Sequence, residues 1–343
     1  MKIIRVFLIL CICVQSLLAQ TGGDNTYEFL NLTNSARVAA LGNVLINTFD
    51  DDINLAQQLP SLNHTGMNHQ FSVNFTNYYA GVKFGSLVYG LPSSKFENIS
   101  VGLQYLNYGD FTRTNEFGDV IGKFSAGEYA MFASTAVEID SSLYVGASLK
   151  AVYSNLDAYS SFGVLCDFSA TYSLKSGRML ASLLMKNAGF QIKTYAKESE
   201  PMPFELVIGL STKLEHAPLR WSISWAHLER WDLSYINPSE PTIDPLTNEE
   251  ISVKYNTRDK IFSHLHVGGE FLFSKNFNIR LGYNFRRRQE LALDLYKHNV
   301  GLTWGFSMRV SKFHFNYARA AYHAVGPMHT FSVTSSLNNF KRK

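Results

Sequence analysis

From Asn68 onward, apolar residues recur at every second position along many short stretches of the chain. In the stretch 143–153, alternate positions carry the apolar side chains Leu143, Val145, Ala147, Leu149, Ala151 and Tyr153. The positions between them carry small or polar residues such as Gly146, Ser148 and Lys150. Because successive side chains of a β-strand point to opposite faces, this pattern predicts strands with one apolar and one polar face.

About fourteen such segments follow one another, and most exceed the roughly five or six residues usual for strands of globular proteins. The expected strands are 68–76, 80–89, 97–108, 128–138, 142–154, 160–173, 179–187, 204–214, 218–228, 262–274, 277–286, 297–309, 312–320 and 328–337. A tilted strand of about 9–11 residues crosses a bilayer. The pattern therefore predicts an all-β fold, a transmembrane antiparallel β-barrel of about fourteen strands over residues 67–343.

The connections between these strands alternate in length. Tight turns are expected at 139–141, 215–217, 275–276 and 310–311, and long loops at 109–127, 188–203 and 229–261. Short turns at one end and long loops at the other are typical of an outer-membrane barrel. The alternative is a secreted β-sandwich, but such a fold would turn its Trp and Tyr residues inward and its charges outward.

Aromatic residues lie near many of the expected strand ends. They are Tyr105, Tyr108, Tyr153, Tyr159, Tyr172, Trp231, Phe285 and Tyr296. Rings at these places are expected to form the girdles that mark the two lipid–water interfaces of a barrel.

Composition and charge exclude several other classes. Hydrophobic residues make up 46% of the 343 residues, which is ample for burial and excludes a disordered chain. No apolar run reaches the roughly 18 residues of a membrane-spanning helix. A net charge of +3 provides no strong basic field, so a nucleic-acid partner is not expected.

The first residues read as an export signal. Lys2 and Arg5 precede the apolar stretch Val6–Val14, and Ala19 places a small residue at a plausible cleavage position. Residues 1–19 are therefore expected to be a cleaved signal peptide. Its removal leaves Cys166 as the one cysteine, so the mature protein has no internal disulfide.

Residues 20–66 do not follow the strand pattern and are expected to form a partly helical plug in the barrel lumen. Asn34 or Ser35 is expected to cap a short helix over 36–41. Gly42 stands where a glycine commonly ends a helix.

This segment also carries a recognisable pattern. Tyr27-Glu28-Phe29-Leu30-Asn31-Leu32 is followed by Ser35-Ala36-Arg37-Val38-Ala39-Ala40-Leu41-Gly42-Asn43. The pattern resembles the opening of the PorV/PorQ family, fourteen-stranded, FadL-like outer-membrane proteins of the type IX secretion system in Bacteroidetes. The motif residues are Tyr27, Phe29, Leu30, Ser35, Ala36, Arg37, Leu41 and Gly42.

The resemblance implies a role and a set of partners. The chain would be a non-catalytic component of the outer membrane of a Gram-negative bacterium. Its extracellular loops would hold a PorZ-like surface protein. PorU and PorV would belong to the same attachment complex, which joins secreted cargo to lipopolysaccharide.

The longest expected loop, 229–261, is the first candidate for partner binding. It contains Trp231, Tyr235 and Tyr255 in a frame stiffened by prolines. Trp and Tyr are favoured anchors of protein interfaces, so these residues are predicted to contact the partner. The alternative is a mobile exterior loop without a partner.

A run of three arginines is the candidate for lipid binding. Arg286, Arg287 and Arg288 are expected at the outer end of the eleventh strand. Arginine suits bidentate contact with phosphate, so the run is predicted to meet lipopolysaccharide. The alternative is a solvated strand end that Glu290 partly neutralises.

No motif predicts catalysis, a metal or a cofactor. The chain has no Gly-x-Ser-x-Gly nucleophile elbow, no phosphate-binding loop and no dinucleotide fingerprint. The run Asp50–Asp52 is compatible with Ca²⁺, but acidic residues at a helix start explain it better. His264 and His266 share a strand face and form a possible metal pair, although polarity of the lumen or of its rim is the preferred explanation.

Two other functions remain open at this stage. A FadL-like transporter of a hydrophobic small molecule would show an apolar pocket between plug and wall, and a strand kink such as the glycine-rich segment Gly81–Gly90 provides. A passive porin would need a wide polar lumen that no plug obstructs.

Overall fold

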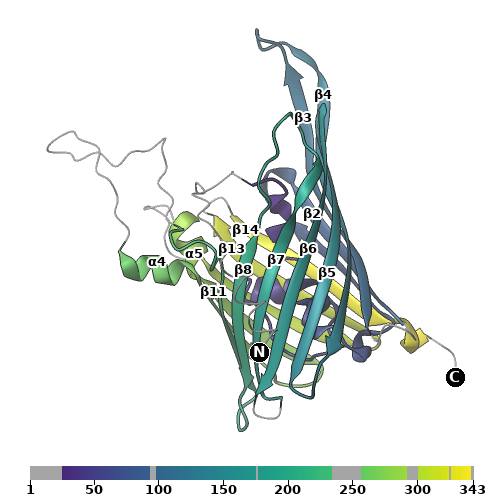
Figure 1. Cartoon of the computed structure of the whole chain (residues 1–343), viewed down its shortest axis with the longest axis vertical. Helices are drawn as coiled ribbons and strands as arrows, with labels where there is room; N and C mark the ends of the chain where they lie inside the picture. The colour runs from purple at the N-terminus through teal and green to yellow at the C-terminus, as the bar shows by residue number, and fades with distance from the viewer. Residues whose placement is uncertain are drawn as a thin grey trace, which may run out of the picture.

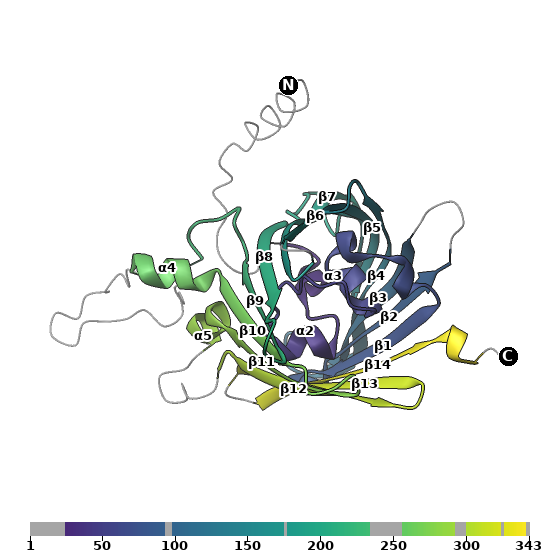
Figure 2. The ribbon, with the colours of Figure 1, turned by 90° about the horizontal axis from the view of Figure 1, so that it is seen from below.

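The computed structural model describes residues 25–92, 98–174, 177–233, 256–291, 300–323 and 326–340. The predicted signal peptide lies outside these residues. Fourteen antiparallel strands form a closed barrel, in which β1 pairs with both β2 and β14 (Figures 1 and 2). The strands are β1 Gln70–Asn77, β2 Lys83–Leu91, β3 Ile99–Thr114, β4 Val120–Glu138, β5 Leu143–Leu156, β6 Tyr159–Leu174, β7 Met179–Lys193, β8 Glu205–Lys213, β9 Leu219–Trp225, β10 Leu265–Phe271, β11 Phe277–Asn284, β12 Leu302–Val310, β13 Phe313–His323 and β14 Gly326–Ser336.

Each of the fourteen expected strands coincides with an observed one, so the predicted fold class is confirmed. The largest error concerns the long loop predicted at 109–127. Strands β3 and β4 continue through this segment and join in a turn at 115–119. They rise well beyond the neighbouring strands at the loop end of the barrel (Figure 1).

Two short helices replace parts of expected strands. Residues Thr257–Ser263 form α4 just before β10, and Phe285–Leu291 form α5 directly after β11. Single-turn helices η4 Tyr79–Gly81 and η5 Leu337–Phe340 follow β1 and β14. Within the described ranges, no helix has the length and apolar character of a membrane-spanning helix.

The outer face of the barrel is apolar and the inner face is polar. On β1, Val73 is 49% and Phe75 is 38% exposed, whereas the alternating Ser72 and Asn74 are 0% and 4% exposed. A closed barrel satisfies its backbone hydrogen bonds internally, and an outward apolar face matches lipid rather than water. The sheet is therefore built to cross a membrane.

The predicted aromatic girdles are correct only in part. Tyr153, Tyr159 and Tyr172 are among the exposed outward rings. The prediction is wrong for Tyr108, because its hydroxyl donates a hydrogen bond to Glu128 inside the barrel, at 2.7 Å. Tyr296 lies outside the described residues.

Residues 25–69 lie within the lumen as a plug (Figure 2). Its elements are η1 Glu28–Asn31, α2 Ala36–Ala40, α3 Ile53–Gln58, η2 Pro60–Leu62 and η3 Thr65–Met67. The predicted cap is confirmed, since the Ser35 side chain accepts a hydrogen bond from the Val38 amide at the start of α2. Because the wall is polar inside, the plug supplies much of the apolar core, including Leu41, Ile46, Ile53, Leu55, Leu59 and Leu62.

Inward-facing glycines let the plug backbone touch the wall. A Cβ added to Gly282 on β11 would lie 2.1 Å from the Leu41 carbonyl carbon. A Cβ on Gly146 of β5 would lie 2.3 Å from the Ser61 amide nitrogen. Gly42 itself has φ +74°, a left-handed conformation that glycine adopts without strain.

A substitution pair tests this contact. Gly282→Ala places a methyl group against plug backbone, and such overpacking costs about 1–3 kcal/mol. We expect the temperature at which the folded gel band converts to the unfolded band to fall. Gly269→Ala on β10 is the control, because nothing lies within 4 Å of its added Cβ. Equal behaviour of the two variants would contradict the close plug–wall contact.

Candidate functional site

A buried ionic cluster joins the plug to the wall. Arg37 of α2 donates from Nε to Oε1 of Glu270, at 3.0 Å, and from Nη2 to Oε2, at 2.9 Å. Glu270 lies on β10, and its side chain is 1% exposed. A bidentate guanidinium–carboxylate pair is both strong and directional, so it fixes where α2 sits against the wall.

The sheet register brings two more arginines to the same carboxylate. Glu270 lies directly opposite Arg220 on β9 and opposite Arg280 on β11. Arg220 Nη1 donates to Glu270 Oε2 at 3.0 Å, and Arg280 Nε donates to Oε1 at 2.9 Å. Glu270 thus receives three guanidinium groups.

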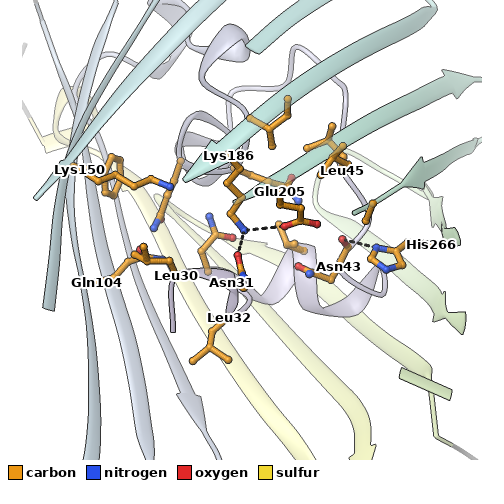
Figure 3. Close-up of a pocket in the computed structure, with 18 residues that line it drawn as sticks. Leu30, Asn31, Leu32, Asn43, Leu45, Gln104, Lys150, Lys186, Glu205 and His266 are labelled. Atoms are coloured by element: carbon orange, nitrogen blue, oxygen red, sulfur yellow. Dashed lines mark hydrogen bonds and ion pairs between the residues drawn. The ribbon is translucent and has the colours of Figure 1, made fainter. Parts of the chain in front are cut away.

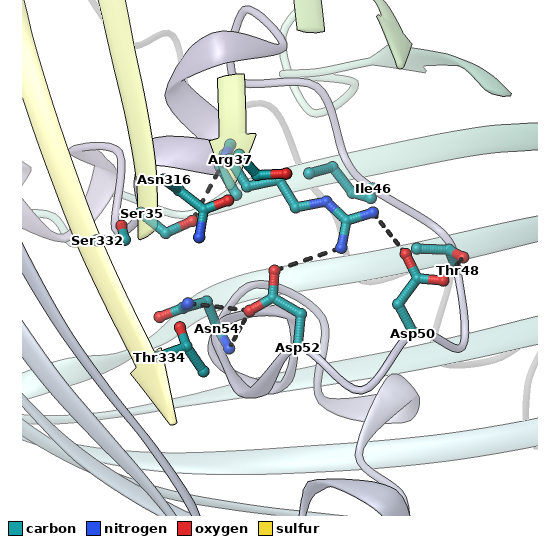
Figure 4. Close-up of polar contacts among 12 residues, drawn as sticks. Ser35, Arg37, Ile46, Thr48, Asp50, Asp52, Asn54, Asn316, Ser332 and Thr334 are labelled. Atoms are coloured by element: carbon teal, nitrogen blue, oxygen red, sulfur yellow. Dashed lines mark hydrogen bonds and ion pairs between the residues drawn. The ribbon is translucent and has the colours of Figure 1, made fainter. Parts of the chain in front are cut away.

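Two plug carboxylates complete the cluster (Figure 4). Asp50 accepts from Arg37 at 2.7 Å and from Arg220 at 2.7 and 3.1 Å. Asp52 accepts from Arg37 at 3.3 Å. Three arginines and three carboxylates therefore balance each other in charge, which buried ions require.

The pKa values of the plug members reflect this balance. Burial alone would raise the pKa of Asp50, but the guanidinium groups of Arg37 and Arg220 hold it well below its usual range. Burial alone would lower the pKa of Arg37, but Glu270, Asp50 and Asp52 raise it. Arg37 and Asp50 are therefore charged at neutral pH, and we call the cluster of Arg37, Asp50, Asp52, Arg220, Glu270 and Arg280 the ionic lock.

The expectation for Asp50–Asp52 is therefore correct in part. Asp52 caps α3, because its side chain accepts from the Asn54 amide at 3.2 Å. Asp50 instead binds arginines of the plug and the wall. Among the described residues, no three His, Cys, Asp or Glu side chains gather as they would around a metal ion.

The two candidate histidines contact backbone rather than each other. His266 Nδ1 lies 3.3 Å from the Asn43 carbonyl oxygen of the plug. His264 Nδ1 lies 2.7 Å from the Ala226 carbonyl oxygen. His264 precedes β10 rather than belonging to it, so the expected pair on one strand does not form, and polarity of the lumen or of its rim stays the preferred explanation.

A second polar network ties η1 to a bulge in β7. Asn187 has φ +58°, and the pairing of β6 and β7 shifts register beside it. Its amide N–H donates to Asp167 at 2.8 Å, and its side chain accepts from Lys150 Nζ at 2.8 Å and donates to Asn31 of the plug at 3.2 Å. Lys150 also pairs with Asp167 at 2.6 Å. The network fills the bulge and holds the plug at a second point.

A small cavity remains between the plug and the wall beside this network (Figure 3). Its volume is about 70 Å³, and its lining mixes apolar residues such as Leu45, Phe132 and Leu184 with polar ones. Lys186 crosses one side, 2.9 Å from Asn31 and 3.6 Å from Glu205. A cavity of roughly 150 Å³ is known to hold one benzene molecule, so this one is too small for a hydrocarbon as it stands.

A larger polar cavity of about 400 Å³ opens at the end of the barrel where the turns are. Arg309, Lys312 and His314 line it, and the ionic cluster forms part of its wall. Asp50 is 35% exposed on this side. The barrel wall therefore separates the lock from lipid, while water reaches it from the turn end.

Residues of the predicted plug motif contact the barrel wall and hold the plug in place. Tyr27 is buried, and its hydroxyl lies 2.5 Å from the Ser161 hydroxyl of β6. Phe29 and Leu30 join a buried apolar cluster with wall residues. Together with the cap, the lock and the close glycine contact, these residues all position the plug.

The candidate loop and arginine residues lie at the loop end of the barrel. Trp231 is 64% exposed, whereas Tyr235 and Tyr255 lie outside the described residues. The three arginines belong to α5 rather than to a strand end. Arg286 pairs with Glu290 at 2.6 Å, and Arg287 is buried, so the run does not share one exposed face.

The lock can be tested by removing one partner. Arg37→Gln leaves Glu270 and Asp50 with fewer cations, and breaking a buried ion pair costs about 3–5 kcal/mol. We expect a lower unfolding temperature and faster cleavage of the plug by a protease. Arg178→Gln is the control, because its partner Glu215 is 61% exposed and such surface pairs contribute at most about 1 kcal/mol. Equal losses in the two variants would argue against the lock.

The lock also predicts a pH dependence. The pKa of Asp50 is depressed in the folded state and near 3.9 in the unfolded chain, so its contribution to stability is complete above about pH 4. It is lost as the pH falls through the lower, folded-state value. We expect the unfolding temperature of the wild type to fall more steeply below pH 4 than that of Asp50→Asn. Parallel curves would contradict this assignment.

Comparison with known proteins gives a likeness of fold. No protein-family model matches the sequence, and no curated protein matches it either. The structure is similar to the Pseudomonas putida toluene transporter TodX, with 13% identity, a TM-score of 0.48, and coverage of 89% of this chain and 97% of that chain. A Pseudomonas aeruginosa FadL homologue is 11% identical, with a TM-score of 0.48 and coverage of 89% of this chain and 98% of that chain. The Acinetobacter baumannii outer membrane protein Omp33 is 8% identical, with a TM-score of 0.38 and coverage of 78% of this chain and 98% of that chain. These likenesses are of fold alone, and the closed fourteen-stranded barrel is established by the strand pairing of this chain itself.

Proposed function

We propose that the chain is a non-catalytic anchor of the outer membrane, which holds a surface protein through the loop end of its barrel. By the resemblance of its plug motif to the PorV/PorQ family, and to PorQ most closely, it would serve the type IX secretion machinery. The partner would be a PorZ-like protein in a complex with PorU and PorV. Contact of Arg286–Arg288 with lipopolysaccharide stays a prediction.

The observation that carries the proposal is the β3–β4 ribbon, residues 109–125. Pairing of β3 with β2 stops at Asn107, and pairing of β4 with β5 stops at Ala126. In the described part of the sheet, both edges of the ribbon therefore carry backbone groups that no neighbouring strand uses. Open strand edges are a common means of binding an extended segment of a partner.

The tip of the ribbon presents apolar side chains on a well-ordered turn. The Asn115 side chain accepts from the amides of Phe117 and Asp119, at 3.0 and 2.9 Å. Phe117 is nonetheless 89% exposed, and Val120 and Ile121 are 69% and 60% exposed. Clustered apolar exposure of this kind is typical of a protein-binding site.

The ribbon is also stiffened along its length. The rings of Phe111 and Phe124 stack across the strands at 5.1 Å, and the Arg113 guanidinium lies 5.7 Å from the Phe124 ring centre. Arg113 forms an ion pair with Asp157 of the neighbouring hairpin. A two-stranded ribbon is only marginally stable alone, so these contacts favour a docking arm held ready for its partner.

Transport of a hydrophobic small molecule is the second candidate. The partly apolar cavity between plug and wall favours it, because that is where a FadL-like transporter would hold its cargo. The cavity is small, however, and enlarging it requires movement of a plug that the ionic cluster holds in place. Uptake would therefore depend on opening the lock, whereas docking would not.

Replacing residues 109–126 with an Asn-Gly turn tests the docking role. The turn closes a short hairpin, so the barrel should still fold and shift on gels with heating. We expect the surface partner to be lost from affinity pull-downs of detergent-solubilised outer membranes, read by mass spectrometry. Phe117→Ser should weaken binding roughly thirtyfold, as the loss of an aromatic anchor worth about 2 kcal/mol would.

Glu116→Gln at the same tip is the matched control and should leave the partner bound. Retention of the partner by the folded ribbon deletion would overturn the docking role of the ribbon. Loss of surface-attached cargo on gene deletion supports the anchor. Loss of growth on a hydrophobic compound, with cargo still attached, would support transport instead.

A further inference from the structure

The helices α4 and α5 lie side by side outside the barrel wall, next to β9, β10 and β11. Both views place them beyond the perimeter of the sheet rather than over the lumen (Figures 1 and 2). The Gln289 side-chain amide of α5 donates to the Asp259 carbonyl oxygen of α4 at 2.9 Å, which joins the two helices. A helix pair in this position overhangs the lipid that surrounds the barrel.

The height of the pair follows from the strand lengths. Strand β10 begins two residues after α4 and has 7 residues, and β11 has 8 residues and runs directly into α5. With the residues that lead into their turns, these strands approach the length of about 9–11 residues that crosses a bilayer. The helices therefore begin at the level where the hydrocarbon layer ends.

An unbroken row of aromatic rings leads from the lipid-facing wall to α4. The Tyr283 and Phe285 rings meet edge to face at 4.7 Å, and Phe285 stacks with Phe262 of α4 at 5.2 Å. Leu281, two residues before Tyr283, is 46% exposed on the lipid-facing side of β11. Ile261 and Phe262 remain 46% and 43% exposed, so the apolar surface of the barrel continues onto the helix.

The charges of the two helices favour an anionic surface. The sequences of α4 and α5 contain five basic and two acidic residues, in TRDKIFS and FRRRQEL. Arg258 and Lys260 precede the apolar pair Ile261 and Phe262 along α4. Basic residues beside bulky apolar ones are typical of helices that lie in the headgroup region of a membrane.

We propose that α4 and α5 form an interfacial foot that rests on the membrane at the loop end of the barrel. Ile261 and Phe262 insert at the boundary between headgroups and acyl chains. The exposed Arg258 contacts the phosphates of lipid headgroups, whereas Lys260 pairs with Asp232. The inference does not depend on the proposed partner, because it rests on the position, the exposed apolar side chains and the charges of α4 and α5.

Fluorescence quenching tests the proposal on the full chain. Cys166→Ala removes the native thiol, and Ile261→Cys, Leu281→Cys or Phe117→Cys then carries an environment-sensitive dye. Each protein is reconstituted into phosphatidylcholine vesicles with lipids brominated on the acyl chains close to the headgroup, with and without phosphatidylglycerol. We expect position 261 to lose roughly half of its fluorescence, as a residue at the headgroup boundary would.

Position 281 is the control for a lipid-facing site, and the ribbon-tip position 117 is the control for an apolar site exposed to water. Quenching at 281 without quenching at 261 would overturn the proposal and leave the foot as a surface for a protein. Arg258→Gln should reduce the quenching at position 261 most in vesicles with phosphatidylglycerol. An unchanged signal in that variant would contradict the contact of Arg258 with lipid phosphates.

Discussion

The carboxylate of Glu270 is the point on which the interior of this barrel depends. Cross-strand pairing places Arg220 and Arg280 on either side of it, and the plug supplies Arg37, Asp50 and Asp52. Burying one such charge without partners costs several kcal/mol, which is a large part of the free energy of unfolding of a typical domain. The wall alone supplies two arginines and one carboxylate, so Arg37, Asp50 and Asp52 of the plug complete the charge balance, and the pairing of Arg37 with Glu270 fixes where α2 sits.

This constraint explains the remaining structure of the lumen. The polar inner wall offers hydroxyl and amide groups to the plug backbone, while glycines at the contact points let the two chains touch. The plug carries its own apolar core, which the wall does not provide. What remains between them is a small cavity beside Lys186 and a larger polar one at the turn end.

The outer surface of the barrel has three zones, which face lipid, the lipid–water boundary and water. The apolar faces of the strands meet lipid, the α4–α5 pair stands at the edge of that layer, and the β3–β4 ribbon rises into water. Each zone keeps the side-chain chemistry that its solvent favours. An apolar tip such as Phe117, far from lipid and 89% exposed, is the exception, and it is the feature that most favours a protein partner.

The sequence by itself determined the strands, their number and the closed, lipid-facing sheet, because alternation is a local property that each strand displays alone. It missed the extension of β3 and β4, where both faces meet water and no alternation marks them. Helices α4 and α5, at seven residues each, are too short to show a helical period. The ionic cluster depends on the tertiary structure alone. Arg37 and Glu270 are 233 residues apart, and their charges meet because the barrel closes around the plug and the strand register fixes their positions.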